Sequence, residues 1–320
     1  MRNLLITLLL ISLGTSLCLA GELDGYKVVT SNFRTGDSEI FVVDLATGDA
    51  RNVTPHSHSY NRYPAWSPDG SRVSFVSDRD GTFNLYSVNA DGSNLRQLTH
   101  ESQGVVTGMQ SWSADGRWIY FGLFGKEVGP PWSNSKNGLI CRIAPDGTRF
   151  QIVGEGTDGA VSPDGSKIVF ARALAHGYVL FLMNSDGTGV HQLTTHEDSL
   201  GGVHATWSPD GNNIIYGDSV GEALELFMCD ADGKNIRQLT HLGKGATSPS
   251  VSPDQKFISF RLAEDIYWRD GARSEQAYKE RKADLRPVWV MGFDGSNPHV
   301  VEPLHYQTMI DGSRASFKPR

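Results

Sequence analysis

Histidines stand in the stretches of this sequence that separate its regular alternating segments, and imidazole is the side chain here best suited to chemistry. Five of them occupy such stretches: His56, His58, His196, His204 and His305. Imidazole nitrogens bind divalent transition metals and act as general bases near neutral pH. The sequence therefore offers His58, His204 and His305 as ligands of a divalent metal such as manganese. The metal site is the alternative interpretation; the main one is a ring of solvated loop histidines without a metal.

These stretches separate copies of one repeated motif, whose first copy is Trp66-Ser67-Pro68-Asp69-Gly70. The aspartates of successive copies are spaced by 46, 49, 46 and 44 residues. A period of about 40 to 50 residues is typical of a β-propeller, in which each repeat forms one blade. The later copies are Trp112-Ser113-Ala114-Asp115-Gly116, Val161-Ser162-Pro163-Asp164-Gly165, Trp207-Ser208-Pro209-Asp210-Gly211 and Val251-Ser252-Pro253-Asp254-Gln255.

Segments that alternate apolar and polar residues follow each copy, as expected of strands. After the first copy they cover residues 72–77 and 84–89, and the turn Asn89-Ala90-Asp91-Gly92 leads to a closing run, Arg96-Gln97-Leu98-Thr99. Asp-Gly supplies the positive φ that a hairpin turn requires. Calcium loops are the alternative for these aspartates, but the ligand spacing of such loops, which ends in Glu, is absent. Each repeat therefore predicts a four-stranded antiparallel meander.

Six such meanders predict an all-β fold, a six-bladed β-propeller, because stacking around an axis covers their faces and ring closure hides their edges. The first blade lacks an opening Trp-Ser-Pro-Asp strand, and residues 311–317 echo residues 69–75. We therefore expect the C-terminal strand to pair with the N-terminal blade and close the ring. The expected blades are residues 26–54 plus 304–317, 61–99, 107–153, 157–194, 202–240 and 246–301.

The loops of such a propeller divide between two rims, with connections between blades on one rim and Pro-Asp-Gly and Asp-Gly turns on the other. The connecting rim carries the two long insertions, residues 122–138 and 261–286. Long loops on a compact fold often carry function. The candidate binding residues, all expected on this rim, are His58, Arg62, Tyr63, Gln110, Trp132, Asp158, His204, His305 and Gln307.

Three of these candidates, Asp158, His204 and Gln307, precede their repeat motifs by three residues, which predicts a position near the mouth of the central channel. Together with Arg62 and Tyr63 they form a polar funnel suited to a sugar acid or a peptide. Two further features have open alternatives. Trp132 follows two prolines. Its ring is either a rigid platform for a ligand or a cap on its own blade. Residues 270–286 have the composition of a basic helix, which either docks an acidic partner or forms a solvated lid.

The motif at residues 66–70, the turn at 77–81 and the run at 91–99 resemble the WD-like repeats of the TolB-type β-propeller family, over nearly all of the chain after residue 20. TolB itself has an α/β domain before its propeller, whereas the first blade here begins within about six residues of residue 20. The resemblance implies a non-catalytic binding scaffold without a cofactor. Such a scaffold presents its loop rim or channel mouth to a protein partner or a glycan, as in envelope translocation.

Similar repeats also occur in oligogalacturonate lyases, which use histidines and a metal in a funnel of this kind. A polysaccharide lyase acting on uronate oligomers is therefore the alternative function. In that interpretation His204 or Tyr63 is the base and Arg62 neutralises the substrate carboxylate. Manganese would be held by His58, His204 and His305. Convergence of the three histidines on one point favours the lyase, and outward-pointing side chains favour the scaffold.

The sequence predicts no Gly-x-Ser-x-Gly elbow between a strand and a helix, so it gives little support to nucleophilic hydrolysis. Cys141 and Cys229 fall on the third strands of blades that are not neighbours, which predicts two buried thiols and no disulfide. Four tryptophans at repeat positions are expected in the core: Trp66, Trp112, Trp207 and Trp289.

The first 20 residues have the pattern of a signal peptide, with Arg2, an apolar run and small residues before Gly21. A lipidated Cys18 is the alternative, although the small residue expected just before it is missing. The remaining residues 21–320 are predicted to form a single domain, periplasmic or secreted after cleavage near Ala20. No other stretch has the roughly 20 apolar residues that a membrane span needs.

The charge balance also limits the partners. The chain has 29 Lys and Arg against 36 Asp and Glu, a formal net charge of −7. An acidic surface of this kind is unsuited to nucleic acid or to an anionic membrane. We expect a monomer that binds a protein or a glycan.

Overall fold

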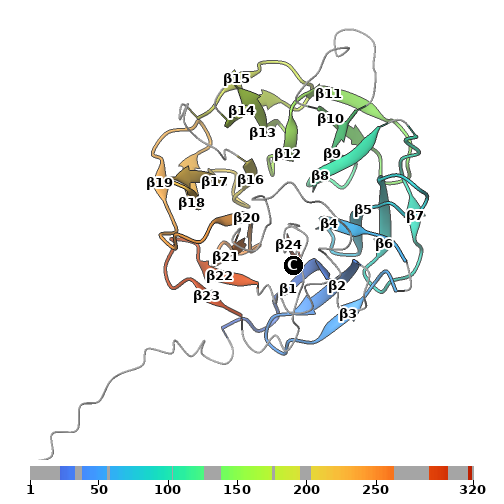
Figure 1. The fold of residues 1–320 in the computed structure, drawn as a ribbon, viewed down its shortest axis with the longest axis horizontal. Helices are drawn as coiled ribbons and strands as arrows, with labels where there is room; N and C mark the ends of the chain where they lie inside the picture. Colours follow the sequence, from blue (N-terminus) through green and yellow to red (C-terminus); the bar gives the residue numbers. More distant parts are fainter. Residues whose placement is uncertain are drawn as a thin grey trace, which may run out of the picture.

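The chain forms a ring of six four-stranded antiparallel sheets around a central axis (Figure 1). This computed structural model describes residues 22–32, 38–55, 58–102, 104–125, 138–174, 177–194, 203–262, 288–301 and 316–318. Within these ranges every regular element is a strand, and they contain no helix long and apolar enough to cross a membrane. The six-bladed propeller predicted from the repeats is therefore confirmed.

Each blade runs from an innermost strand beside the axis to an outermost strand at the perimeter (Figure 1). Blade 1 consists of β24 (Ser316–Phe317), β1 (Lys27–Asn32), β2 (Glu39–Asp44) and β3 (Ala50–Asn52). Blade 2 consists of β4 (Asn61–Trp66), β5 (Arg72–Ser77), β6 (Asn84–Asn89) and β7 (Arg96–Gln97). Blade 3 consists of β8 (Val105–Trp112), β9 (Ile119–Phe124), β10 (Leu139–Ile143) and β11 (Gln151–Glu155).

The second half of the ring repeats this order. Blade 4 consists of β12 (Thr157–Val161), β13 (Lys167–Leu174), β14 (Gly177–Asn184) and β15 (His191–Gln192). Blade 5 consists of β16 (Val203–Trp207), β17 (Asn213–Val220), β18 (Ala223–Asp230) and β19 (Arg237–Gln238). Blade 6 consists of β20 (Ala246–Val251), β21 (Phe257–Leu262), β22 (Trp289–Gly292) and β23 (His299–Val300).

The ring closes in blade 1, where β24 pairs with β1 as the sequence predicted. Phe317 lies opposite Val28, which is the register that Trp66 has in blade 2. Phe317 therefore occupies the innermost-strand position of Trp66. The expected equivalence of residues 311–317 with residues 69–75 is wrong, because β1 already fills the second-strand position and leaves only the innermost one open.

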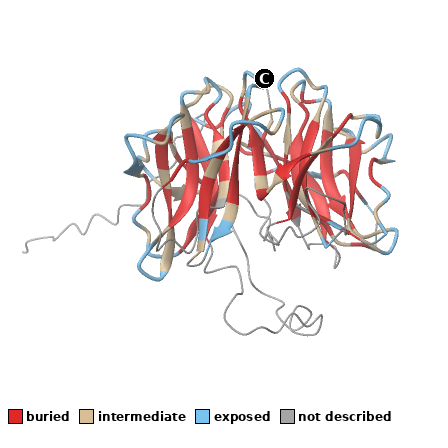
Figure 2. Cartoon of the chain, turned by 90° about the horizontal axis from the view of Figure 1, so that it is seen from above, coloured by how far each residue is buried: buried red, intermediate tan, exposed pale blue. Residues whose placement is uncertain are grey.

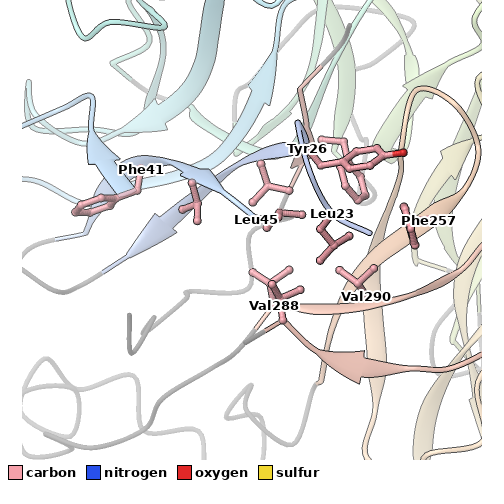
Figure 3. Packing of buried hydrophobic residues seen from close by; sticks show 11 residues of the cluster. Leu23, Tyr26, Phe41, Leu45, Phe257, Val288 and Val290 are labelled. Carbon is pink, nitrogen blue, oxygen red and sulfur yellow. The ribbon is translucent and has the colours of Figure 1, made fainter. Parts of the chain in front are cut away.

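The core lies between the blades as six apolar clusters, one at each interface between neighbouring sheets. Figure 3 shows the cluster that seals the closure between blades 1 and 6. Its centre is Tyr26, whose ring lies edge-on to Phe257 and to Phe317 with centroids 5.4 and 5.9 Å apart. Figure 2 shows the ring from its edge, with buried residues filling the blades and exposed residues at the two rims.

The Ser-Pro-Asp-Gly motif builds the turn between the first and second strands. The Ser67 hydroxyl donates to Asp69 Oδ1 at 2.6 Å and accepts the backbone N–H of Arg72 at 2.9 Å. Hydrogen bonds from Ser67 and Ser71 hold the pKa of Asp69 at about 2. The same serine-to-aspartate bond recurs in the other four copies: Ser113 to Asp115, Ser162 to Asp164, Ser208 to Asp210 and Ser252 to Asp254.

The Asp-Gly turn between the third and fourth strands requires its glycine for two reasons. In blade 5, Gly233 has φ 79°, and a Cβ there would lie 2.5 Å from the Leu193 carbonyl oxygen of blade 4. A side chain would therefore be both strained and in collision with the neighbouring blade. The corresponding glycines also have a positive φ and face a carbonyl oxygen of the preceding blade, at Cβ distances from 2.2 to 3.4 Å: Gly92 at Val53, Gly147 at Leu98, Gly187 at Val153 and Gly295 at Leu239.

The threonine at the end of each Leu-Thr run ties the outermost strand to the third strand. In blade 5, Thr240 accepts the backbone N–H of Leu226 at 2.8 Å and donates to the buried Glu225 carboxylate. In blade 2, Thr99 donates to Asn84 Oδ1 at 2.8 Å. These polar side chains are thus part of the frame of each blade.

The predicted thiols are confirmed, because Cys141 in β10 and Cys229 in β18 are buried and are not joined in a disulfide. Burial raises the pKa of Cys229 to about 12, which keeps this thiol protonated near neutral pH. The expectation for the tryptophans is met in part. Trp66 and Trp207 are buried, whereas Trp112 and Trp289 are partly buried against the core clusters.

Candidate binding site at the channel mouth

The two rims of the ring are named here by their connections. The turn rim carries the Ser-Pro-Asp-Gly and Asp-Gly turns, and the loop rim is the opposite one, where the innermost strands begin. Of the predicted site residues, Trp132, His305 and Gln307 lie outside the described residues. The same holds for His56, His196 and the segment 270–286.

Every innermost strand from β4 to β20 contains a break in its register with the second strand, close to the loop rim. In four of these strands, the residue three positions before the end of the strand has a positive φ without being glycine. Such backbone is uncommon and clusters at functional sites. The four residues are Tyr63 (φ 54°), Asp158 (φ 53°), His204 (φ 59°) and Ser248 (φ 56°).

This bulge changes where the candidate residues lie. Arg62 and Tyr63 are in β4, and His204 is in β16, so they stand within the innermost strands and not in the connections where the sequence analysis placed them. A bulge turns a side chain away from the direction that regular alternation would give it. In blades 2, 4, 5 and 6 the bulges therefore give four side chains of different type the same place in the innermost strand.

His204 and Asp158 are brought together across the interface between blades 4 and 5. The His204 Nε2 atom lies 3.8 Å from Asp158 Oδ2, and the two side chains are 25% and 11% exposed. Asp158 also accepts the backbone N–H of Met109 in blade 3 at 3.3 Å. The pair is thus fixed by neighbours on either side and still accessible from the channel.

The other ring nitrogen of His204 faces blade 6. Its Nδ1 atom lies 3.0 Å from Thr247 Oγ1 and 3.2 Å from Ser248 Oγ, both of β20. Both ring nitrogens of His204 consequently face protein groups. The imidazole is held in one orientation, with its Nε2 edge toward Asp158.

The polar chain continues from blade 6 into blade 1. Thr247 pairs across the strands with Arg261 of β21, a side chain that is almost fully buried. Arg261 Nη2 donates to Thr30 Oγ1 of β1 at 3.3 Å. Polar contacts, joined within blade 6 by the pairing of β20 with β21, therefore link the inner parts of blades 3, 4, 5, 6 and 1.

Arg62 and Tyr63 belong to the other side of the channel, because blade 2 lies opposite blade 5 in the ring (Figure 1). The guanidinium of Arg62 stands over the ring of Phe83 at 4.0 Å, between Tyr63 and Tyr60. The suggested catalytic set of His204, Tyr63 and Arg62 is thus divided between two opposite blades.

The remaining candidates differ in exposure. Gln110 lies in β8 with a side chain only 3% exposed, so it contributes to the inner wall of blade 3. His58 is exposed and has a positive φ of 47° just before β4. Neither residue has a described contact with His204 or Asp158.

Sequence reasoning missed Thr247 and Ser248, which contact His204. Ser248 could have been found, because it precedes Val251 by the same three residues that singled out Asp158 and His204. The same rule was misapplied to Gln307. With Phe317 in the place of Trp66, the equivalent position in blade 1 is Arg314, which lies outside the described residues.

Two of the three proposed metal ligands, His58 and His204, are among the described residues. Among the described residues there is no group of three or more His, Cys, Asp or Glu side chains that could hold a metal ion. At the channel mouth they supply one imidazole and one carboxylate, and Nδ1 of that imidazole already contacts two hydroxyls. The third proposed ligand, His305, lies outside the described residues.

Known proteins are similar to this chain in their repeated sequence and in their fold. Residues 17–126 match the family model of the TolB beta propeller domain. An uncharacterised protein of Agrobacterium fabrum is 31% identical over 151 residues, which are 44% of this chain and 45% of that protein. The match therefore spans less than half of the length of this relative.

Solved structures resemble the whole ring. TolB from Acinetobacter baumannii has a TM-score of 0.68 at 18% identity, covering 92% of this chain and 66% of that one. An oligogalacturonate lyase in complex with manganese has a TM-score of 0.56 at 18% identity, covering 87% and 74%. Likeness at such identity concerns the fold alone. The chain is therefore a six-bladed β-propeller whose residues 17–126 match the TolB beta propeller domain.

Proposed function

We propose that the protein is an exported, non-catalytic binding scaffold that takes a protein partner or a glycan at the channel mouth on its loop rim. The observation that carries the proposal is the set of bulges in the innermost strands. They give Tyr63, Asp158, His204 and Ser248 the same place in four innermost strands, each at a positive φ. The side chains of Tyr63, Asp158 and His204 are partly exposed, and positions of constant backbone but different residue type are suited to recognition.

The contacts of His204 favour binding over catalysis. A general base needs a free ring nitrogen within reach of the proton that it removes. Here Nδ1 contacts two hydroxyls, and Nε2 faces the Asp158 carboxylate. The two side chains are 25% and 11% exposed, so a polar group of a ligand can approach the pair from the channel.

Export is part of the same proposal. It rests on the signal-peptide pattern of residues 1–20, which are outside the described residues. The periplasm or the extracellular space would then be where the scaffold meets its ligand. An N-terminal sequence determined on protein from the envelope fraction tests this part, and a start at Gly21 is the expected result.

The binding role is tested by capture with matched variants. Immobilised protein is incubated with envelope extract and, separately, with an array of glycans. The variants are a double change, Asp158→Asn with His204→Gln, and the control Asp186→Asn in an exposed turn of the opposite rim. We expect the double variant to lose its main ligand at least about tenfold, a difference of about 1.4 kcal/mol, and the control to keep it. Equal retention by all three proteins would contradict the proposal.

A polysaccharide lyase acting on uronate oligomers is the second candidate. The specific observation in its favour is the pairing of His204 with a carboxylate, which orients an imidazole as in acid–base catalysis. The fold also resembles that of an oligogalacturonate lyase in complex with manganese. The assay follows the ultraviolet absorbance of unsaturated uronates after incubation with pectic oligomers and manganese, with and without a chelator. Product that disappears in His204→Gln would establish this function, and its absence from the native protein would reject it.

A further inference from the structure

The loop rim of blade 2 holds an arginine in an unusual setting. The guanidinium carbon of Arg62 lies 4.0 Å from the ring centroid of Phe83, 5.3 Å from that of Tyr63 and 5.5 Å from that of Tyr60. All four side chains are partly exposed. Three aromatic rings therefore hold one cation in place on a surface that solvent can reach.

Among the described residues, the guanidinium of Arg62 has no hydrogen-bonding partner. The Arg62 Nε atom is buried, and no described residue accepts a hydrogen bond from it. No described carboxylate lies within ion-pair distance of this guanidinium either. A planar guanidinium offers its N–H groups as a fork that matches the two oxygens of a carboxylate. The aromatic rings fix the plane of that fork before any ligand arrives.

A second arginine of the same blade shows how the chain treats a purely structural guanidinium. Arg79 also stands against aromatic rings, at 4.8 Å from Tyr86. Its Nε donates to Ser77 Oγ at 3.1 Å and its Nη2 to Asn61 Oδ1 at 3.0 Å. Burial lowers the pKa of Arg79, and neighbouring carboxylates oppose that shift. Arg79 is satisfied inside the blade, whereas the fork of Arg62 faces the rim.

The composition of this cluster favours a protein over a sugar as its ligand. Arginine, tyrosine and other aromatic residues are enriched where protein interfaces concentrate their binding energy. The faces of Phe83 and the tyrosines are turned toward the guanidinium, so they are not open as stacking platforms for a sugar ring. A carboxylate is the group that completes the site by pairing with the free fork.

We propose that Arg62, with Phe83, Tyr60 and Tyr63, forms a carboxylate-binding site on the loop rim that takes an acidic segment of a protein partner. The inference rests on the proposed scaffold function and specifies its ligand. Arg62 contributes a cation on one side of the channel, and the Asp158–His204 pair lies on the other. The partner segment therefore carries an acidic residue where it meets blade 2.

The test measures peptide binding by calorimetry with the purified protein. The probe is hexaglutamate, with hexaglutamine as the neutral peptide and trigalacturonate as the carboxylate-bearing sugar. The variants are Arg62→Gln, which removes the cation, and Phe83→Leu, which removes the ring beneath it. Arg72→Gln, on the turn rim, is the matched control. Thermal unfolding of each variant confirms that the ring is intact.

We expect hexaglutamate to bind the native protein, and the Kd to rise at least about tenfold in Arg62→Gln and about threefold in Phe83→Leu. Arg72→Gln should bind like the native protein. Equal affinity of Arg62→Gln and the native protein overturns the site, as does binding of hexaglutamine. Binding of trigalacturonate without hexaglutamate overturns the choice of a protein ligand. The scaffold function itself fails only if the Asp158 and His204 variants keep their ligand in the capture experiment.

Discussion

The two rims of this propeller use polar side chains in opposite ways. On the turn rim each aspartate bonds to its own turn, as Asp69 does with Ser67 and Ser71, and the same arrangement recurs from blade to blade. On the loop rim the bulge positions differ in residue type. There His204 contacts residues of two neighbouring blades, and Arg62 contacts only aromatic rings among its described neighbours.

This difference separates folding from recognition. A repeated side chain that satisfies itself within about five residues stabilises each blade in the same manner. A position whose backbone is the same in several blades but whose side chain differs adds little to the stability of a blade. The side chain changes from blade to blade while the strands stay the same. The comparison therefore predicts that stability depends on the shared contacts and that binding depends on the variable ones.

Removal of ring closure should have the largest effect. Deletion of the residues after Pro303 removes β24, and with it the Phe317 ring that packs against Tyr26. Loss of one buried Phe side chain alone costs about 3 to 5 kcal/mol. We expect calorimetry to show no cooperative unfolding transition in the truncated protein. A melting curve like that of the full chain would contradict the closure.

Not every polar residue of the loop rim belongs to the binding surface, and a pair of threonine variants tests this boundary. Thr240→Val leaves the Leu226 N–H without its hydroxyl acceptor and removes the donor to buried Glu225, so it should cost about 2 kcal/mol. Thr194→Val removes only the acceptor of the Leu180 N–H, and about 1 kcal/mol is expected. Urea unfolding measures both, and equal losses would argue against a structural role for Glu225.

The sequence was sufficient for the features that repeat. The motif at residues 66–70 recurs with a blade-length period, so the strand order, the turns and the burial of Cys141 and Cys229 followed from it. The position of Phe317 could not be predicted from the repeat. Residues 311–317 resemble residues 69–75 in sequence, but their hydrogen-bonding register in the fold is different.

The site was predictable only in part. Asp158 and His204 could be placed near one another by their common offset from the repeat motif. The contact of His204 with Thr247 and Ser248 depends on a bulge, which one sequence does not reveal because residues as different as Tyr, Asp, His and Ser stand at the positive φ. The aromatic surroundings of Arg62 arise from two loops that meet only in the folded blade.

Acid should lower the stability of the protein by protonating aspartates of the turn rim. The pKa of Asp69 is about 2, below its ordinary value of 3.8, so this carboxylate stabilises the fold above about pH 4 and loses that contribution as the pH falls toward 2. We expect about 1 kcal/mol, less than the full shift implies, because water screens an exposed carboxylate. Urea unfolding at pH 5 and pH 2 should show a smaller acid loss for Asp69→Asn than for the native protein. Identical losses in the two proteins would contradict the stabilising role of Asp69 in this turn.

The smallest effect on stability is expected at the channel mouth. Asp158→Asn keeps an acceptor for the Met109 N–H and loses only the charge near His204. Partly exposed pairs of this kind contribute about 0.5 kcal/mol or less. Its unfolding free energy should therefore stay close to that of the native protein while ligand capture declines. A loss above about 2 kcal/mol would mark Asp158 as part of the frame.

The most direct test of the division between the rims places a photo-crosslinking amino acid at one exposed position on each. His58 represents the loop rim and Arg117 the turn rim. Both proteins are irradiated in the presence of the ligand found by capture, and the crosslinked product is quantified by mass spectrometry. The account predicts a crosslink from position 58 and none above background from position 117. A dominant crosslink from position 117 would contradict it.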